Sequence, residues 1–319
     1  MKFKKVLVTG GAGCIGYQVC RLLEKKKIKV LLFDLPEKIQ KIGIKNTKYL
    51  SYFNGSIMDK VSLEEAIKNC DAVVHLAAYL GVNRTEKNKT RCIEINIIGT
   101  KNVVDVVNNN RNIKKIIFAS SSEVYGEPIS NPVSEKDITQ GKTVYAITKL
   151  AGEEIIKANY EYKKLKYVIL RYFNTFGPYQ VAQFVVPKFI SLIRKNKRPT
   201  INGNGNQTRS YIYSKDTATA TVDCLLSQKT NNKTINIGNS ESKISIINLS
   251  KMIANLMNKN FKSKFNLTFK KGDRKKSREI YNRICAVSLA KKLINFKPIY
   301  TMKQSILETI RENKNFENW

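Results

Sequence analysis

Four side chains in this sequence have the types and the spacing of proton-transfer groups. In the motif YAITK, Tyr145 and Lys149 stand at positions i and i+4, so a helix would place both on one face. A tyrosine loses its proton near pH ~10, and an adjacent ammonium group favours the phenolate. Upstream, the stretch SSSEVYG adds the hydroxyl group of Ser121 and the carboxylate of Glu123. Such a set could take a proton from a substrate hydroxyl group, with Tyr145 as the base.

A glycine-rich turn near the N-terminus has the spacing of a phosphate-binding loop. VTGGAGCIG contains GxxGxxG at Gly10, Gly13 and Gly16, and GxGxxG when it is counted from Gly11. Glycines let the backbone approach a pyrophosphate, which then lies at the N-terminus of the following helix. The next apolar run ends at Asp34, where a carboxylate would bind the adenosine ribose and repel a 2′-phosphate. The sequence therefore predicts NAD, and not NADP, as the cofactor.

The elements that position these residues follow an alternating pattern. Short runs rich in Val, Ile and Leu alternate with segments of helical periodicity in the first half of the chain. Strands of this composition are buried on both faces, as in a parallel sheet covered by helices. The pattern predicts a doubly wound α/β fold with a parallel Rossmann sheet. The expected strands are 5–9, 29–34, 48–53, 72–77, 114–119 and 166–171.

The second half of the chain predicts a smaller lobe. After Arg171, Gly, Pro and Asn gather in FNTFGPYQ and INGNGNQTR, and helical stretches follow. We therefore expect an NAD-binding Rossmann domain at 1–173 and a C-terminal α/β substrate-binding lobe at 174–319. A segment at about 212–240 is expected to return to the first domain.

Composition excludes several classes of protein. The single histidine, His75, lies in an apolar run, which argues against a His-based triad, and the six cysteines lack metal-ligand spacing, so no metal is expected. No apolar run approaches the roughly 20 residues of a membrane span. The net charge of +32 is spread along the chain, which favours an anionic substrate over a nucleic acid or membrane partner. The expected location is the cytoplasm.

Taken together, the motifs resemble one family. Their order is similar to that in extended short-chain dehydrogenase/reductases of the NAD-dependent nucleotide-sugar epimerase/dehydratase family. The motifs are TGGAGCIG, HLAA, EINIIGTKNVV, SSSEVYG, YAITK, LRYFNTFGP and GNGNQTRSYIY. The resemblance spans essentially the whole chain. It implies a nucleotide-diphosphate sugar as substrate. It also implies a homodimer, formed by the helices after Asn96 and Tyr145, whose apolar residues include Val103, Val104, Val106, Val107, Ile147, Leu150, Ile155 and Ile156.

The resemblance also assigns site residues by position. Ser121, Tyr145 and Lys149 match the catalytic set, and Glu123 matches a glutamate that some branches use. The chain departs from the family where Ser56 and Ile57 replace the usual acidic residue near the adenine. The implied cofactor contacts are Gly10, Gly13, Cys14, Ile15, Gly16, Asp34, Ser56, Ile57, Leu76, Ala77, Ala78, Tyr145 and Lys149. The implied substrate contacts are Ser121, Ser122, Asn174, Arg209 and Arg278.

The presence of Glu123 is compatible with three reactions, which all pass through the same 4-keto sugar. A 4-epimerase returns hydride to the other face, a 4,6-dehydratase moves protons at C5 and C6, and a UDP-glucuronate decarboxylase loses the carboxylate on C5. The loop AAYLGVNRTEKN lacks the dehydratase and decarboxylase patterns, so we place 4-epimerisation first. Dehydration or decarboxylation through Glu123 is the alternative. A non-enzymatic NAD-sensing regulator is a distant alternative, because Tyr145 and Lys149 are both present.

Overall fold

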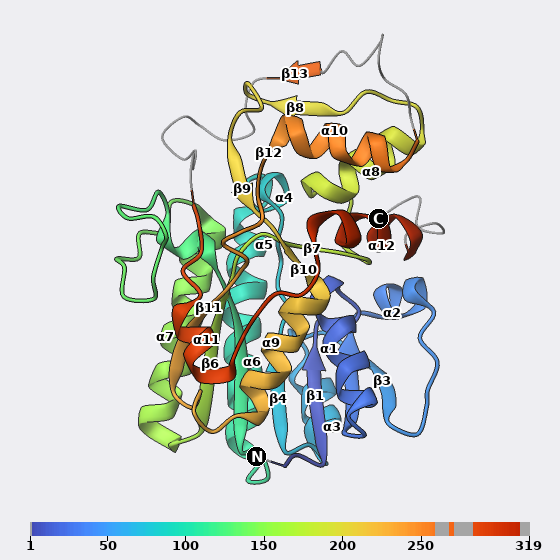
Figure 1. The fold of residues 1–319 in the computed structure, drawn as a ribbon. Helices are drawn as coiled ribbons and strands as arrows, with labels where there is room; N and C mark the ends of the chain where they lie inside the picture. Colours follow the sequence, from blue (N-terminus) through green and yellow to red (C-terminus); the bar gives the residue numbers. More distant parts are fainter. Residues whose placement is uncertain (1, 259–267, 271–282, 313–319) are drawn as a thin grey trace.

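The computed structural model describes residues 2–258, 268–270 and 283–312, and its centre is a seven-stranded sheet (Figure 1). The strand order is β11-β6-β5-β4-β1-β2-β3, and every neighbouring pair runs parallel. This is the doubly wound α/β fold that the sequence predicts. The strands are β1 Lys5–Thr9, β2 Lys29–Asp34, β3 Leu50–Asn54, β4 Ala72–His75, β5 Lys115–Ser121, β6 Lys166–Tyr172 and β11 Lys233–Ile237.

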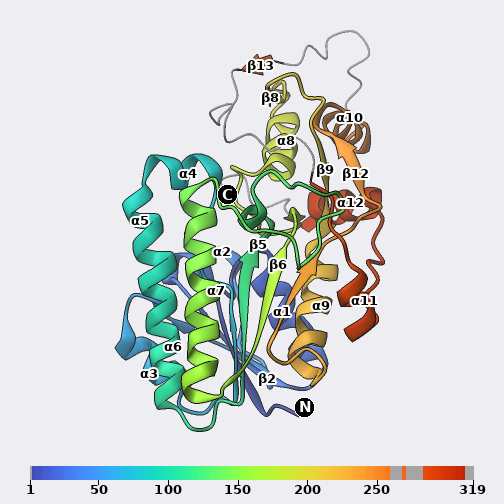
Figure 2. The same cartoon turned by 90° about the vertical axis from the view of Figure 1, so that its left-hand side faces the viewer.

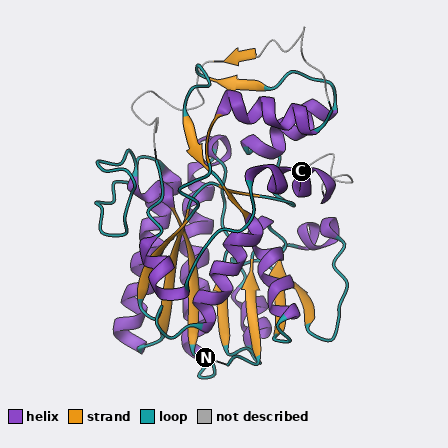
Figure 3. Cartoon of the chain, viewed as in Figure 1, coloured by secondary structure: helices purple, strands orange, loops and turns teal. Residues whose placement is uncertain are grey.

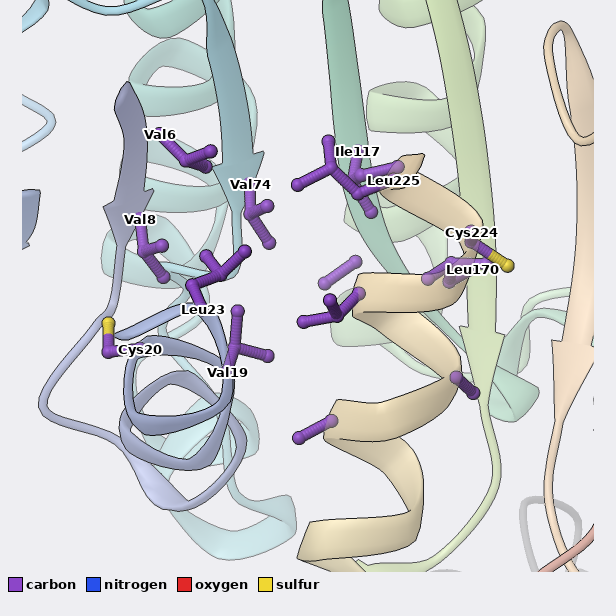
Figure 4. Packing of buried hydrophobic residues seen from close by; sticks show 14 of the residues in the cluster. Val6, Val8, Val19, Cys20, Leu23, Val74, Ile117, Leu170, Cys224 and Leu225 are labelled. Carbon is purple, nitrogen blue, oxygen red and sulfur yellow. The ribbon is translucent and has the colours of Figure 1, made fainter. Parts of the chain in front are cut away.

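Helices cover both faces of the sheet, as Figures 2 and 3 show. One face packs against α1 (Cys14–Lys25), α9 (Ser214–Leu226) and α11 (Ser288–Ile294). The other packs against α3 (Lys60–Ile67), α6 (Gly99–Asn109) and α7 (Val144–Lys163). Figure 4 shows side chains of α1 and α9 meeting those of the central strands. Because both faces are buried, the strands are apolar without alternation.

Shorter elements follow some of the strands. They include α2 (Pro36–Ile42), α4 (Val82–Lys87), α5 (Lys89–Ile93), a π-helical turn η1 (Glu94–Ile98) that leads into α6, and a 3₁₀ turn η2 (Ser122–Tyr125). None of the helices described is long and apolar enough to cross a bilayer.

A second group of elements stands above the edge where the strands end, here called the carboxyl edge (Figure 1). Its helices have their own apolar core. They are α8 (Val185–Arg194), α10 (Ile246–Leu256) and α12 (Met302–Glu312). Three strand pairs complete it: β7 (Thr175–Phe176) with β10 (Ile212–Tyr213), β9 (Thr208–Ser210) with β12 (Lys243–Ser245), and β8 (Thr200–Asn202) with β13 (Thr268–Lys270).

The valines of α6 are not available for a dimer interface, contrary to the sequence-based expectation. Val103, Val104, Val106 and Val107 are each at most 4% exposed and pack into the core on the α3–α6–α7 face. Periodicity shows that a helix face is apolar, but it does not show which neighbour covers that face. On α7, by contrast, Ile147 remains exposed.

A buried polar network ties α7 to the sheet. The Glu153 carboxylate accepts hydrogen bonds from Arg171 Nη2 at 2.7 Å and Nε at 2.9 Å, and from the Ser120 hydroxyl group. Arg171 Nη1 also donates to the Tyr125 hydroxyl group at 2.9 Å, which in turn donates to Asn236 Oδ1 at 2.7 Å. The network therefore joins β5, β6, β11, η2 and α7 at one point behind the carboxyl edge.

Breaking this network should destabilise the fold strongly. Glu153→Ala leaves the Arg171 guanidinium buried without its carboxylate, which typically costs about 3–5 kcal/mol. The matched control is Glu154→Ala, because Glu154 is 70% exposed and pairs with Lys157 on the surface, where such pairs contribute about 0–1 kcal/mol. Urea unfolding followed by circular dichroism compares the two. Equal losses of stability in both variants would contradict the role of the network.

Candidate functional site

The glycine-rich loop forms between β1 and α1 in the GxxGxxG frame. Gly10 adopts a φ of +69°, and a Cβ atom there would lie 2.7 Å from the backbone nitrogen of Ala77. A Cβ atom on Gly16 would lie 2.1 Å from the Gly10 carbonyl oxygen. Only glycine fits at either position. Because no side chain intervenes, the backbone of the loop can approach a bound ligand closely.

Helix α1 presents its N-terminus at this loop. The first intrahelical bond runs from Tyr17 N–H to Gly13 O at 2.9 Å, and Gly13 caps the helix without a side chain. The amide groups of Cys14, Ile15 and Gly16 precede that bond and form the positive end of the helix dipole. This is the arrangement that binds a pyrophosphate.

Asp34 lies at the end of β2, next to the loop. Its carboxylate accepts hydrogen bonds from Ala12 N–H at 2.9 Å and Leu35 N–H at 2.8 Å. Burial raises the pKa of this carboxyl group, and the two amide bonds oppose that rise. The remaining cofactor candidates follow β3 and β4 at the same edge, with Ile57 buried and Ser56, Leu76, Ala77 and Ala78 half-buried.

The loop, the uncapped helix and the aspartate together fit NAD. The helix N-terminus suits the pyrophosphate, and the Asp34 carboxylate suits the hydroxyl groups of the adenosine ribose. The switch in strand order lies between β1 and β4, which is where ligands bind in open α/β sheets.

Ser121, Tyr145 and Lys149 come together at the neighbouring strand. Ser121 closes β5, and its side chain is hydrogen-bonded to Tyr145 in the first turn of α7. One turn later, Lys149 Nζ donates to Ala119 O at 2.8 Å and lies 5.8 Å from the centroid of the Tyr145 ring. The structure thus gathers the three side chains that the sequence proposes as catalytic.

The electrostatics of this group differ from the sequence-based expectation. Burial raises the pKa of Tyr145, the Glu123 carboxylate raises it further, and the bond to Ser121 opposes the rise. Burial also lowers the pKa of Lys149 to about 8. In the protein alone the pKa of Tyr145 is therefore raised on balance, because burial and Glu123 dominate, while the Lys149 ammonium group is directed at Ala119.

Glu123 forms an ion pair that the sequence did not reveal. Arg283 Nη2 donates to Glu123 Oε1 at 2.8 Å, and the arginine side chain is 2% exposed. The other guanidinium nitrogens, Nε and Nη1, are buried and have no hydrogen-bond partner in the described part of the chain. A buried guanidinium with two unused donors, beside a carboxylate that is coupled to Tyr145, is suited to bind an anionic group.

The proposed substrate contacts lie on both sides of the carboxyl edge. Asn174 Nδ2 donates to Ser210 O at 3.1 Å, which holds it next to Arg209 in β9. Arg209 Nη1 donates to Thr208 O at 2.9 Å. Ser122 is buried within η2. Arg278 lies outside the described residues.

Comparison with known proteins gives a match along most of the chain. Residues 6–238 match the model of the "NAD dependent epimerase/dehydratase family". The UDP-N-acetyl-alpha-D-glucosaminuronate decarboxylase of Bacillus cytotoxicus is 33% identical, with 99% of each chain covered. The dTDP-D-glucose 4,6-dehydratase of Dictyostelium discoideum is 33% identical over 79% of this chain, which spans 62% of that protein.

A solved structure is similar to the same extent. The UDP-N-acetylglucosamine 4-epimerase of Methanobrevibacter ruminantium, in complex with UDP-N-acetylmuramic acid, is 32% identical with 98% of both chains covered and a TM-score of 0.86. The sequence identity of this chain to a decarboxylase, to a dehydratase and to an epimerase is therefore nearly the same. Sequence identity alone does not distinguish between the three reactions.

The cofactor site gives a direct prediction for Asp34. In a titration, the wild-type protein should bind NAD in preference to NADP, because the carboxylate repels a 2′-phosphate. Asp34→Asn removes the charge and keeps the size, so it should reduce that preference at least about 10-fold, equivalent to ~1.4 kcal/mol. Asp59→Asn, at the exposed N-cap of α3, is the control and should leave the preference unchanged. Preferential binding of NADP by the wild type would contradict the assignment.

Proposed function

Because the chain belongs to the NAD-dependent epimerase/dehydratase family, we propose that it oxidises a nucleotide-diphosphate uronate at C4 and releases the sugar carboxylate as carbon dioxide. The observation that carries this proposal is the buried Arg283, which is paired with Glu123 and has two further donors. A sugar carboxylate is the kind of group that such a site would hold, since hydrogen bonds from a charged guanidinium to a carboxylate are short and strong.

The first step uses the residues at the end of β5 and the start of α7. Tyr145, as the phenolate, removes the proton from the C4 hydroxyl group, and Ser121 holds that hydroxyl group by a hydrogen bond. A bound NAD would supply the hydride acceptor for C4 and the hydride for the closing reduction. Asn174 and Arg209 are assigned to the diphosphate, because an arginine matches phosphate oxygens in geometry and charge.

The second step follows from the ketone. A carboxylate on C5 lies β to the C4 carbonyl group, so the bond between C5 and the carboxyl carbon can break, with its electron pair passing to the C4 oxygen as an enolate. Arg283 holds the carboxylate before it leaves as carbon dioxide, and it keeps Glu123 as a partner afterwards. Glu123 is assigned to the proton that C5 then takes up.

The second candidate is 4-epimerisation, which the sequence analysis placed first. It is favoured by the similarity to the Methanobrevibacter ruminantium enzyme over 98% of both chains. It is also favoured by the loop at 79–88, which lacks the proline-containing segment of decarboxylases. This reaction requires Ser121, Tyr145 and Lys149 but moves no proton at C5.

The product made in heavy water distinguishes the reactions. With UDP-glucuronate or its N-acetylated analogue, we expect a product that has lost the mass of carbon dioxide and carries deuterium at C5, by mass spectrometry and NMR. Glu123→Gln should lower turnover by about 10²–10⁴-fold, as loss of a general acid or base does. Reduced nicotinamide should accumulate in this variant, because oxidation at C4 still proceeds.

Two further results keep this test decisive. Tyr145→Phe is the control, since it blocks the oxidation itself and no reduced nicotinamide should accumulate. A product of unchanged mass without deuterium, formed by a fully active Glu123→Gln enzyme, would replace decarboxylation with 4-epimerisation. Loss of water would indicate a dehydratase.

Assembly as a homodimer is part of the proposal. Three isoleucines remain exposed along α5, η1 and α7: Ile93, Ile98 and Ile147, at 45%, 49% and 55%. Helices related by a two-fold axis could bury them together. We expect a dimer in light scattering, and a monomer for Ile98→Glu combined with Ile147→Glu.

The control for assembly is Ile129→Glu. Ile129 is 84% exposed but lies in the loop after η2 and not on α5, η1 or α7, so this variant should remain dimeric. A monomeric wild-type protein at working concentration would refute the dimer.

A further inference from the structure

The edge where the strands begin is rich in lysine. All seven strands of the parallel sheet start at one edge, opposite the catalytic groups, and the lower end of the molecule in Figure 1 is this edge. Five of the strands have lysine as their first residue, at Lys5, Lys29, Lys115, Lys166 and Lys233. Of these, Lys115 is buried, where its ammonium group binds the C-terminal end of α9 through Cys224 O and Ser227 O.

The turns at the same edge add more basic side chains. Helices α1, α3, α6, α7 and α9 end there, each just before a strand. The exposed or half-buried basic residues of this edge, here called the lysine edge, are Lys4, Lys5, Lys25, Lys26, Lys27, Lys29, Lys48, Lys68, Arg111, Lys114, Lys163, Lys164, Lys166, Lys229 and Lys233.

Helix dipoles do not account for this charge. Each helix C-terminus is equivalent to roughly half a negative charge, so five helix ends offset only a few of these cations. Carboxylates at this edge offset only part of the charge. Asp71 accepts the backbone N–H groups of Lys4 and Lys5 at 2.7 and 3.1 Å, Glu24 pairs with Arg21 at 2.6 Å, and Glu65, Glu161 and Asp223 lie near the ends of α3, α7 and α9. A large positive surplus faces solvent.

A cavity lies within this edge. Its volume is about 520 Å³, and its lining contains the four lysines Lys4, Lys5, Lys29 and Lys48 but no carboxylate. Thr47, Tyr49, Leu50, Ser51 and Asn69 complete the lining. The Thr47 hydroxyl group already donates to the Glu24 carboxylate, and Tyr49, Ser51 and Asn69 supply neutral hydrogen-bonding groups. The set suits a phosphate ester with hydroxyl substituents.

The sequence analysis argued against a membrane partner because the charge is spread along the chain, but the fold brings these lysines to one edge. We propose that the lysine edge docks on an anionic phospholipid bilayer, with a head-group phosphate in the cavity. The edge is broad, since seven strands at a spacing of ~4.8 Å span about 30 Å. The catalytic groups lie at the opposite edge and would face solution. This inference is independent of the reaction at the carboxyl edge.

The composition of the edge favours a bilayer over a nucleic acid. All of its exposed basic residues except Arg111 are lysines, which act as point charges toward a charged surface. Nucleic-acid sites depend more on arginine forks and on aromatic platforms for bases. Tyr162, which is 78% exposed at the end of α7 beneath Lys163, has the amphipathic character of residues at a membrane interface.

The test is co-sedimentation of the full chain with vesicles. We expect binding to vesicles that contain phosphatidylglycerol, no binding to pure phosphatidylcholine, and release by high salt. The variant Lys29→Gln, Lys48→Gln, Lys114→Gln, Lys233→Gln should partition at least about 100-fold less, since each lysine near an anionic surface contributes roughly 5-fold. Its turnover should be unchanged, because none of these residues lies in the catalytic site.

The matched control removes the same charge elsewhere. Lys195, Lys197, Lys251 and Lys303 are exposed on α8, α10 and α12 or beside them, and their replacement by glutamine should reduce vesicle binding less than about 10-fold. An equal loss in both variants would overturn the proposal. Tighter binding to a DNA duplex than to vesicles, or binding of soluble glycerol phosphate as tight as that of vesicles, would also overturn it.

Discussion

The buried ion pair between Glu153 and Arg171 fixes where the reactive groups stand. Glu153 lies one turn beyond Lys149 on α7, and its carboxylate also binds Ser120, the residue before Ser121 on β5. Arg171 reaches from β6 to Tyr125, at the end of the turn that carries Glu123. The ion pair thus fixes the positions of α7 and η2 relative to the sheet. A shift of either element would separate Ser121 from Tyr145, because each is anchored only a few residues from this pair.

Burial governs the chemistry of the same region. It raises the pKa of Tyr145 and lowers that of Lys149, so both side chains tend toward their neutral forms in the protein alone. Burial, and then the charge of Lys149, lowers the pKa of His75 to about 3 beneath the same strand ends, where its ring is hydrogen-bonded to Thr9 and Thr100. The charged groups around the tyrosine are therefore Glu123 with its arginine, and Lys149, whose pKa of about 8 leaves it largely protonated at neutral pH. A substrate or cofactor that brings charge into this region will change the protonation of Tyr145 strongly, since a dry environment magnifies electrostatic effects.

Local sequence patterns were sufficient to predict the fold and part of the site. The Rossmann strands are apolar runs, and the glycine loop and the YAITK helix are defined by residues close together in the chain, so spacing alone predicts their geometry. Arg283 escaped prediction because its partner Glu123 is 160 positions away and no local motif marks it. The valines of α6 were expected at a dimer interface but lie in the core for a related reason. An apolar helix face has the same sequence pattern whether a second subunit or the sheet covers it. The π-helical turn at Glu94–Ile98 leaves no periodicity that distinguishes it from the helix it joins.

The long separation of Glu123 and Arg283 also has a consequence for the order of biosynthesis. The glycine loop, Asp34 and the strand ends that follow it are complete when little more than the first third of the chain has left the ribosome. Arg283 and β11, which supplies Asn236 to the buried network, are translated much later. The loop residues of the dinucleotide pocket therefore emerge well before the reaction centre, whereas α9 and α11, which cover the same face of the sheet as α1, emerge late.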